Sequence, residues 1–177
     1  MKVRIGLIAT AVLLTAVTFS GCLGEEDNGT NSEFNKEGAL EFSLKVVGTY
    51  FDNQKEEFYS CLGEELYSLE GGQPVSKEDV VGSFDENEYL IDEVYTEHTF
   101  EEYMETYEPR VLDQEEIVSE YPEFKDIEFS GWEPDDDDYL FIGYETKAGK
   151  EGFLWEDPLV FMVTFEKGYW TVKAFGG

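Results

Sequence analysis

The stretch LVFMVTFEKGYWTVKAF, residues 159–175, decides the fold class of this chain. Large apolar side chains fill its first half, which is typical of a strand. In such a strand the odd-numbered residues share one face and the even-numbered residues share the other. Lys167 and Gly168 interrupt this run as a two-residue turn, a length that joins neighbouring antiparallel strands. We therefore predict a C-terminal hairpin with strands at residues 159–166 and 169–175.

Two segments upstream of the hairpin also have the composition of strands. Residues 124–131 and 139–146 are rich in aromatic and β-branched side chains and are bounded by turn-forming residues. Together with the hairpin they predict a meander of four antiparallel strands. Residues 89–94 form a shorter apolar run, which is predicted as a strand or extended segment.

The N-terminal half of the chain has helical spacing instead. Apolar residues within 36–62 recur at intervals of three, four and seven, which predicts one long helix. Asn35 is its predicted cap and Gly63 its predicted end. Shorter helices are predicted at residues 64–69, 76–84, 99–107 and 111–121. The predicted fold class is α+β, with the long N-terminal helix and the shorter helices packed on a C-terminal antiparallel sheet.

This order of elements resembles the cystatin-like cone of the nuclear-transport-factor-two-like superfamily. The resemblance is carried by residues 40–62, residues 76–84 and the hairpin that ends in Trp170-Thr171-Val172-Lys173. It implies a long helix, shorter helices and a final hairpin that wrap one pocket. Enzymes, receptors and scaffolds all use this fold, so the resemblance leaves the function open.

The first residues of the chain predict its cellular location. Lys2 and Arg4 precede an uncharged run at residues 5–19, which is the layout of a signal peptide spanning residues 1–21. The run is shorter than the ~20 apolar residues that a membrane-spanning helix needs. An uncleaved N-terminal anchor helix is the alternative, because such length limits are soft.

Phe19-Ser20-Gly21-Cys22 resembles the lipobox of prokaryotic lipoproteins, in which an aliphatic residue, a small residue and Gly or Ala precede a lipidated Cys. Phe19 departs from the usual Leu. The resemblance implies cleavage after Gly21 and a lipid with two hydrocarbon chains on Cys22, and two chains are what stable membrane anchoring requires. We therefore expect a lipid-anchored protein on the extracytoplasmic face of the cell membrane.

Residues 22–35 are polar and nearly lack large apolar side chains, which predicts a flexible tether between Cys22 and the domain at residues 36–177. Asn28-Gly29-Thr30 fits the acceptor pattern for N-glycosylation, so Asn28 is a candidate modification site. With Cys22 lipidated, Cys61 is the remaining thiol, and its place in an apolar stripe favours a buried side chain over a reactive one.

The charge of the chain excludes one class of function. There are 41 acidic and 12 basic side chains, for a net charge of −29, which becomes −31 when removal of residues 1–21 takes away Lys2 and Arg4. Such a surface repels nucleic-acid phosphates, so no nucleic-acid partner is expected. The acidity fits either a salt-adapted archaeon or bacterium, where screening relieves self-repulsion, or a cation-attracting surface at a cell envelope.

Catalytic motifs such as GxSxG, HExxH, the P-loop and GxGxxG are not present in the sequence. His98 is the single histidine, and its position ahead of a helix start favours a surface or capping role over a general base. Asp135, Asp136, Asp137 and Asp138 are candidate calcium ligands, although a solvated acidic turn explains them as well and no other cofactor is expected.

Aromatic side chains of the predicted strands could line a pocket for a small apolar ligand, or could simply fill the core. These candidates are Trp132, Tyr139, Phe141, Tyr144, Trp155, Phe161 and Trp170. The first interpretation of the whole chain is a non-enzymatic envelope lipoprotein whose acidic domain binds a ligand or an envelope protein partner. The alternatives are a cone-fold enzyme acting on a small molecule and a surface protein stabilised by calcium or salt.

Overall fold

The computed structural model describes residues 34–80, 97–122, 131–154 and 159–176, together with residues 124, 127 and 129. The predicted signal peptide, Cys22, Asn28, most of the predicted tether, the predicted segment 89–94 and Trp155 lie outside the described residues. The described helices are α1 (Lys36–Phe51), α2 (Lys55–Cys61), α5 (Phe100–Thr106) and α6 (Gln114–Glu120). The strands are β1 (Leu62–Ser68), β2 (Pro74–Val75), β3 (Arg110–Leu112), β4 (Asp138–Ile142), β5 (Val160–Glu166) and β6 (Tyr169–Gly176).

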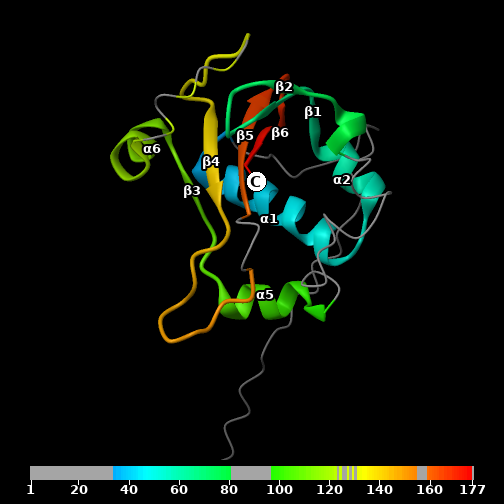
Figure 1. Ribbon diagram of the computed structural model, residues 1–177, viewed down its shortest axis with the longest axis vertical. Helices are drawn as coiled ribbons and strands as arrows, with labels where there is room; N and C mark the ends of the chain where they lie inside the picture. Colours follow the sequence, from blue (N-terminus) through cyan, green and yellow to red (C-terminus); the bar gives the residue numbers. More distant parts are fainter. Residues whose placement is uncertain are drawn as a thin grey trace, which may run out of the picture.

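The six strands form one sheet in the order β2-β1-β6-β5-β4-β3, and α1 runs across one of its faces (Figure 1). The α+β fold class is therefore confirmed. The sheet is mixed, however, and not antiparallel throughout, because β1 runs parallel to β6. This parallel pair places the final strand of the chain inside the sheet, between β1 and β5, where both of its edges are hydrogen-bonded.

The predicted C-terminal hairpin is confirmed. β5 and β6 pair antiparallel from Glu166 and Tyr169 at the turn to Val160 and Gly176 at the far end. Lys167 and Gly168 both have positive φ, 54° and 92°, which the two-residue turns of twisted hairpins require. The alternation along β5 is confirmed as well, because its odd-numbered residues pack toward α1 and its even-numbered apolar residues pack on the opposite face.

The prediction of one helix over residues 36–62 is wrong in its middle. The chain breaks between α1 and α2, where Asn53 adopts φ 52°, a conformation that asparagine tolerates better than most residues. The predicted start is confirmed, since Asn35 Oδ1 accepts a hydrogen bond from the Gly38 amide at 2.8 Å. Gly63 does not end a helix but lies in β1, where a Cβ would come within 3.0 Å of the Val172 carbonyl oxygen.

Three further segments differ from their predictions. Residues 64–69 belong largely to strand β1 and not to a helix, because their side chains alternate between buried and exposed pairs beside β6. Residues 111–121 are not one helix, since Asp113 caps α6 after strand β3 has ended. Within 124–131, the described residues are not in a strand, and the strand predicted at 139–146 is shorter, ending as β4 at Ile142.

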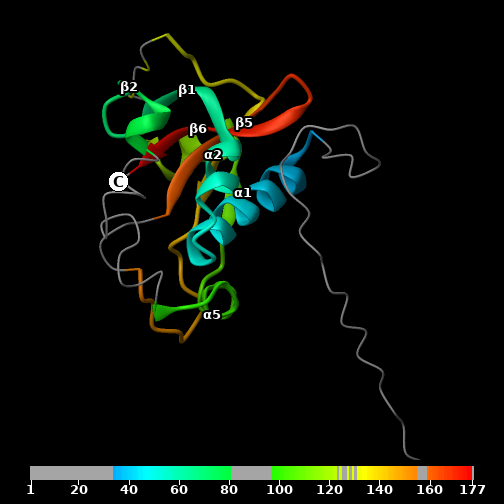
Figure 2. The same cartoon turned by 90° about the vertical axis from the view of Figure 1, so that its right-hand side faces the viewer.

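The predicted helix starts at Ser76 and Thr99 are both confirmed. The Ser76 hydroxyl accepts a hydrogen bond from the Asp79 amide at 3.0 Å, and residues 77–80 are helical. Thr99 and Glu102 form a reciprocal capping box at the start of α5. Figure 2 shows α5 at the end of the molecule opposite the β5–β6 hairpin.

Two apolar clusters lie on the two faces of the sheet. The larger one joins α1, α2 and α5 to the sheet through side chains such as Val46, Phe58 and Phe161. The smaller one lies on the opposite face around Leu140 and Met162. Burying both faces fixes the strand register, because a slip of one residue would move apolar side chains to the wrong face.

Candidate functional site

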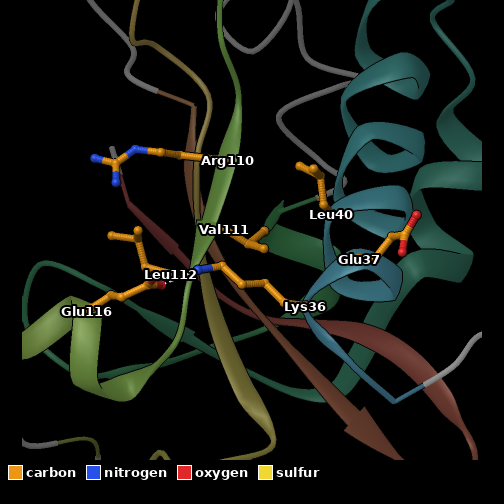
Figure 3. A pocket seen from close by; sticks show the side chains of 7 residues that line it. All are labelled: Lys36, Glu37, Leu40, Arg110, Val111, Leu112 and Glu116. Atoms are coloured by element: carbon orange, nitrogen blue, oxygen red, sulfur yellow. Dashed lines mark hydrogen bonds and ion pairs between the residues drawn. The ribbon is translucent and has the colours of Figure 1, made fainter.

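A cleft of about 320 Å³ opens between the start of α1, strand β3 and helix α6. Its lining residues are Lys36, Glu37, Leu40, Arg110, Val111, Leu112 and Glu116 (Figure 3). β3 is the outermost strand of the sheet, so the cleft runs along a sheet edge. Its volume is at the lower end of the range of about 300–1,000 Å³ that small-molecule sites occupy.

The floor of the cleft is apolar. Leu40 on α1 and Val111 on β3 face one another across it (Figure 3). Val111 pairs with Phe141 and faces the α1 side of the sheet, whereas Leu112 pairs with Leu140 and belongs to the opposite cluster. The cleft therefore adjoins both apolar clusters at the edge of β3, but Val111 and Leu112 are each only 2% exposed, so the half-buried Leu40 is the apolar lining residue left accessible to a ligand.

An ion pair between the Lys36 ammonium and the Glu116 carboxylate spans the mouth of the cleft from α1 to α6. Both side chains remain partly exposed, at 44% and 38%. Glu116 also accepts the Asp113 amide as part of the capping box of α6. The capping box therefore holds the Glu116 side of the rim, and the ion pair joins it to Lys36 on α1.

Arg110 extends from β3 away from α1 (Figure 3). Its guanidinium donates to Glu145 through Nε at 2.9 Å and through a terminal nitrogen at 2.8 Å, and it lies 2.8 Å from a Glu120 oxygen. These bonds raise the pKa of Arg110 and, in return, hold the pKa of Glu145 below its ordinary value. Burial, with hydrogen bonds to Tyr144 and Glu145, raises the pKa of Tyr121 beside them.

The charge of the cleft differs from that of the whole chain. Its lining contains two basic and two acidic side chains, whereas the chain contains 12 basic and 41 acidic ones. Both cations are already paired, Lys36 with Glu116 and Arg110 with Glu120 and Glu145, so the balance holds for the lining residues and not for the carboxylates around them.

Three buried polar side chains lie side by side across β4, β5 and β6, at the end of the sheet near the β5–β6 turn. Asp138, Thr164 and Thr171 are register neighbours across β4, β5 and β6, and each is less than 5% exposed. Asp138 Oδ2 accepts the Asp135 amide at 2.7 Å, while Asp138 Oδ1 and Thr171 Oγ1 lack hydrogen-bond partners within the described part of the chain. Burial raises the pKa of Asp138 to about 6, against the opposing effects of hydrogen bonds from the Asp135 amide and the Thr164 side chain and of the Lys173 charge.

The four candidate calcium ligands do not point the same way. Asp138 is turned into the sheet, whereas Asp135, Asp136 and Asp137 are exposed in the preceding turn. Asp135 Oδ1 accepts the Asp137 amide at 2.9 Å, so the carboxylates stabilise the turn itself. No group of three or more potential metal ligands is found among the described residues. A calcium site here stays a prediction.

The candidate pocket-lining aromatics are divided between the two faces of the sheet. Four of them, Tyr139, Phe141, Phe161 and Trp170, belong to the cluster on the α1 side. Trp132 and Tyr144 pack against the opposite cluster. The rings of Phe141 and Phe161 stack at 4.7 Å between centroids and are at most 1% exposed. The structure does not bring these six side chains together around one space.

His98 and Cys61 occupy structural positions. The imidazole of His98 stacks on Phe153 with centroids 3.8 Å apart, and its Nδ1 lies 3.6 Å from a Glu102 oxygen. Cys61 is 1% exposed at the end of α2, which confirms that it is buried.

The local sequence patterns do not predict the cleft. Residues 111–121 were predicted as one helix, which hid both the edge strand β3 and the start of α6. A signal was present, because Asp113 followed by Glu116 has the capping spacing that correctly predicted α5 at Thr99. Lys36 and Leu40, on the opposite wall, come from a helix whose start was predicted correctly.

Comparison with protein-family models, with curated proteins and with solved structures finds no match to this chain. The resemblance to cystatin-like cones therefore stays a prediction. Among the helices of the described residues, none combines the length and the apolar character needed to cross a bilayer.

Proposed function

We propose that this chain is a membrane-anchored envelope lipoprotein whose domain is a non-enzymatic binding module. The anchor is a lipid on Cys22, and the domain lies on the extracytoplasmic face of the cell membrane. Support comes from the leader at residues 1–21 and the lipobox-like sequence before Cys22. The polar segment that follows leads directly to the capped start of α1 at Asn35.

The binding site that we propose is the cleft between α1 and β3, and its ligand is a small molecule with an apolar body. The observation that carries this proposal is a cleft of about 320 Å³ whose apolar lining is Leu40, Val111 and Leu112, with the half-buried Leu40 accessible. On a chain with net charge −29, equal numbers of basic and acidic side chains in the lining reduce the electrostatic repulsion of an anionic ligand. Ligands with one anionic group could also use Lys36 at the mouth.

The anchor is tested by replacing the lipid acceptor. Wild-type protein from the native membrane fraction should partition into a detergent phase and carry a diacyl or dialkyl glycerol mass on Cys22, whereas Cys22→Ser protein should partition into buffer. A wild-type chain with an intact Met1 or without lipid mass on Cys22 contradicts the proposed anchor.

The cleft is tested with anilinonaphthalene sulfonate, a fluorescent probe with an apolar body and one anionic group. Wild-type protein should bind it saturably, and Leu40→Glu should abolish binding by placing a charge on the apolar floor. Val118→Glu on α6 is the matched control, because Val118 is 45% exposed and does not line the cleft. Equal probe binding by both folded variants contradicts a site in the cleft.

A further inference from the structure

Three aromatic rings pack together where the chain enters the domain, and a fourth lies at the tip of the same hairpin. Phe34, just ahead of α1, lies over the β5–β6 hairpin, with ring centroids 5.5 Å from Phe165 and 6.2 Å from Trp170. The rings of Phe165 and Trp170 lie 5.0 Å apart, whereas Tyr169 directly follows the hairpin turn and its side chain points to the opposite face of the strand from Trp170. Figure 2 shows the start of α1 beside this hairpin. We refer to Phe34, Phe165, Tyr169 and Trp170 as the hairpin-end cluster.

The hairpin-end cluster is incompletely covered by protein. Phe34 is 47% exposed and Tyr169 is 51% exposed, and they are two of the four large apolar side chains that are exposed among the described residues. Trp170 is buried, but its Nε1 has no hydrogen-bond partner in that part of the chain. Exposed aromatic rings beside polar backbone are characteristic of the interface between water and a lipid bilayer.

Ion pairs balance much of the charge around this cluster. The Lys167 ammonium lies 3.5 Å from a Glu64 oxygen, and Lys173 lies 3.0 Å from Glu166. The acidic turn formed by Asp135, Asp136 and Asp137 adjoins the hairpin-end cluster as well, since the Phe165 amide donates to the Asp137 carbonyl at 3.3 Å. This end of the domain therefore has apolar rings and paired charges, with unpaired carboxylates at one side.

The length of the predicted tether decides what can reach this surface. Phe34 follows the proposed anchor Cys22 by twelve positions. A chain of that length has a root-mean-square span of about 20 Å and cannot exceed about 40 Å. Tethering at this span corresponds to an effective concentration on the order of millimolar, so even weak contacts with the lipid surface are populated.

We propose that the hairpin-end cluster rests on the bilayer that holds the lipid of Cys22, with Phe34 and Tyr169 among zwitterionic headgroups. This inference rests on the lipid anchor proposed above and adds an orientation of the domain to it. The acidic turn beside the cluster determines the lipid class, because Asp136 and Asp137 repel anionic headgroups more than zwitterionic ones. α5, at the opposite end of the molecule, points away from the membrane (Figure 1).

The test uses the full lipidated chain in phosphatidylcholine vesicles that contain lipids brominated near the headgroup. Tyr169→Trp places a fluorescent indole at an exposed position of the cluster. The emission of this added indole is obtained by subtracting the spectrum of wild-type protein from that of the variant. Bromine quenches nearby indoles, so we expect the added emission to be mostly lost. Glu105→Trp on α5 is the control, since Glu105 is exposed at the far end of the molecule, and its added emission should be retained.

Flotation of the same vesicles separates failure of the anchor from failure of the orientation. If the wild-type chain does not float with the vesicles, the lipid anchor and the inference built on it both fall. If both variants float but Tyr169→Trp is quenched no more than Glu105→Trp, the anchor stands and the proposed orientation is overturned. Replacing phosphatidylcholine by phosphatidylglycerol should reduce the quenching, and equal or stronger quenching would overturn the assignment to zwitterionic headgroups.

Discussion

Replacing Asp138 by Asn should stabilise the protein at neutral pH. Burial raises the pKa of Asp138 from its ordinary 3.8 to about 6, which outweighs the hydrogen bonds from the Asp135 amide and the Thr164 side chain and the attraction of Lys173. A shift of this size corresponds to about 3 kcal/mol, at about 1.4 kcal/mol for each pH unit. An amide in place of the carboxylate keeps an oxygen for the Asp135 amide but carries no charge into the sheet.

The sign of the pH dependence follows from the raised pKa. The folded state favours neutral Asp138, so this side chain contributes its full stability below pH 3.8 and loses it as the pH rises through about 6. The Asp138→Asn variant has no such loss. It should therefore exceed the wild type in free energy of unfolding by up to about 3 kcal/mol at pH 7.5, and the difference should vanish near pH 4.

Urea unfolding of both proteins, followed by tryptophan fluorescence at several pH values, measures this difference directly. Taking the difference removes the contributions of the other carboxylates, which both proteins share. Asp136→Asn is the matched control, because Asp136 is exposed in the neighbouring turn and its removal changes the charge equally. A variant that is less stable than wild type at pH 7.5 would refute the reasoning and show that Lys173 compensates the buried carboxylate.

Further substitutions test the packing and hydrogen bonds of the fold by the same unfolding assay. Gly143→Ala should cost about 2 kcal/mol, because its Cβ would lie within 3.0 Å of three side-chain atoms, whereas Gly48→Ala in the last turn of α1, where a Cβ meets nothing within 4 Å, should stabilise by up to about 1 kcal/mol. Tyr107→Phe should cost about 2 kcal/mol and accelerate exchange of the two loop amides that donate to its hydroxyl, as measured by hydrogen exchange. Arg110→Lys should lose the two-bonded contact with Glu145 and destabilise by less than about 1 kcal/mol, an effect that 1 M salt should diminish.

Local patterns predicted the elements that local physics controls. Alternation and the Lys167-Gly168 turn predicted the hairpin, because its two strands are adjacent in sequence and need no distant partner. Capping residues likewise predicted the starts of α1 and α5. The break at Asn53 was not predicted, since asparagine also occurs within helices and its positive φ is visible only in the structure.

Long-range pairing was the part that could not be predicted from local patterns. Residues 62–68 follow helix α2 directly, and their only strand partner nearby in sequence is the two-residue strand β2, so most of β1 depends on hydrogen bonds with the distant strand β6. The cleft also depends on contacts between segments that are distant in sequence. Its walls come from α1, β3 and α6, and only the sheet topology places Leu40 beside Val111.

The position of β6 has a consequence for the order in which the protein can fold. β6 follows the other five strands in the sequence, yet it is an interior member of the sheet, and β1 and β5 are joined only through it. A chain that ends before residue 169 would leave those two strands without their shared neighbour and would expose both apolar faces. Completion of the sheet must therefore wait until residues 169–176 have been synthesised.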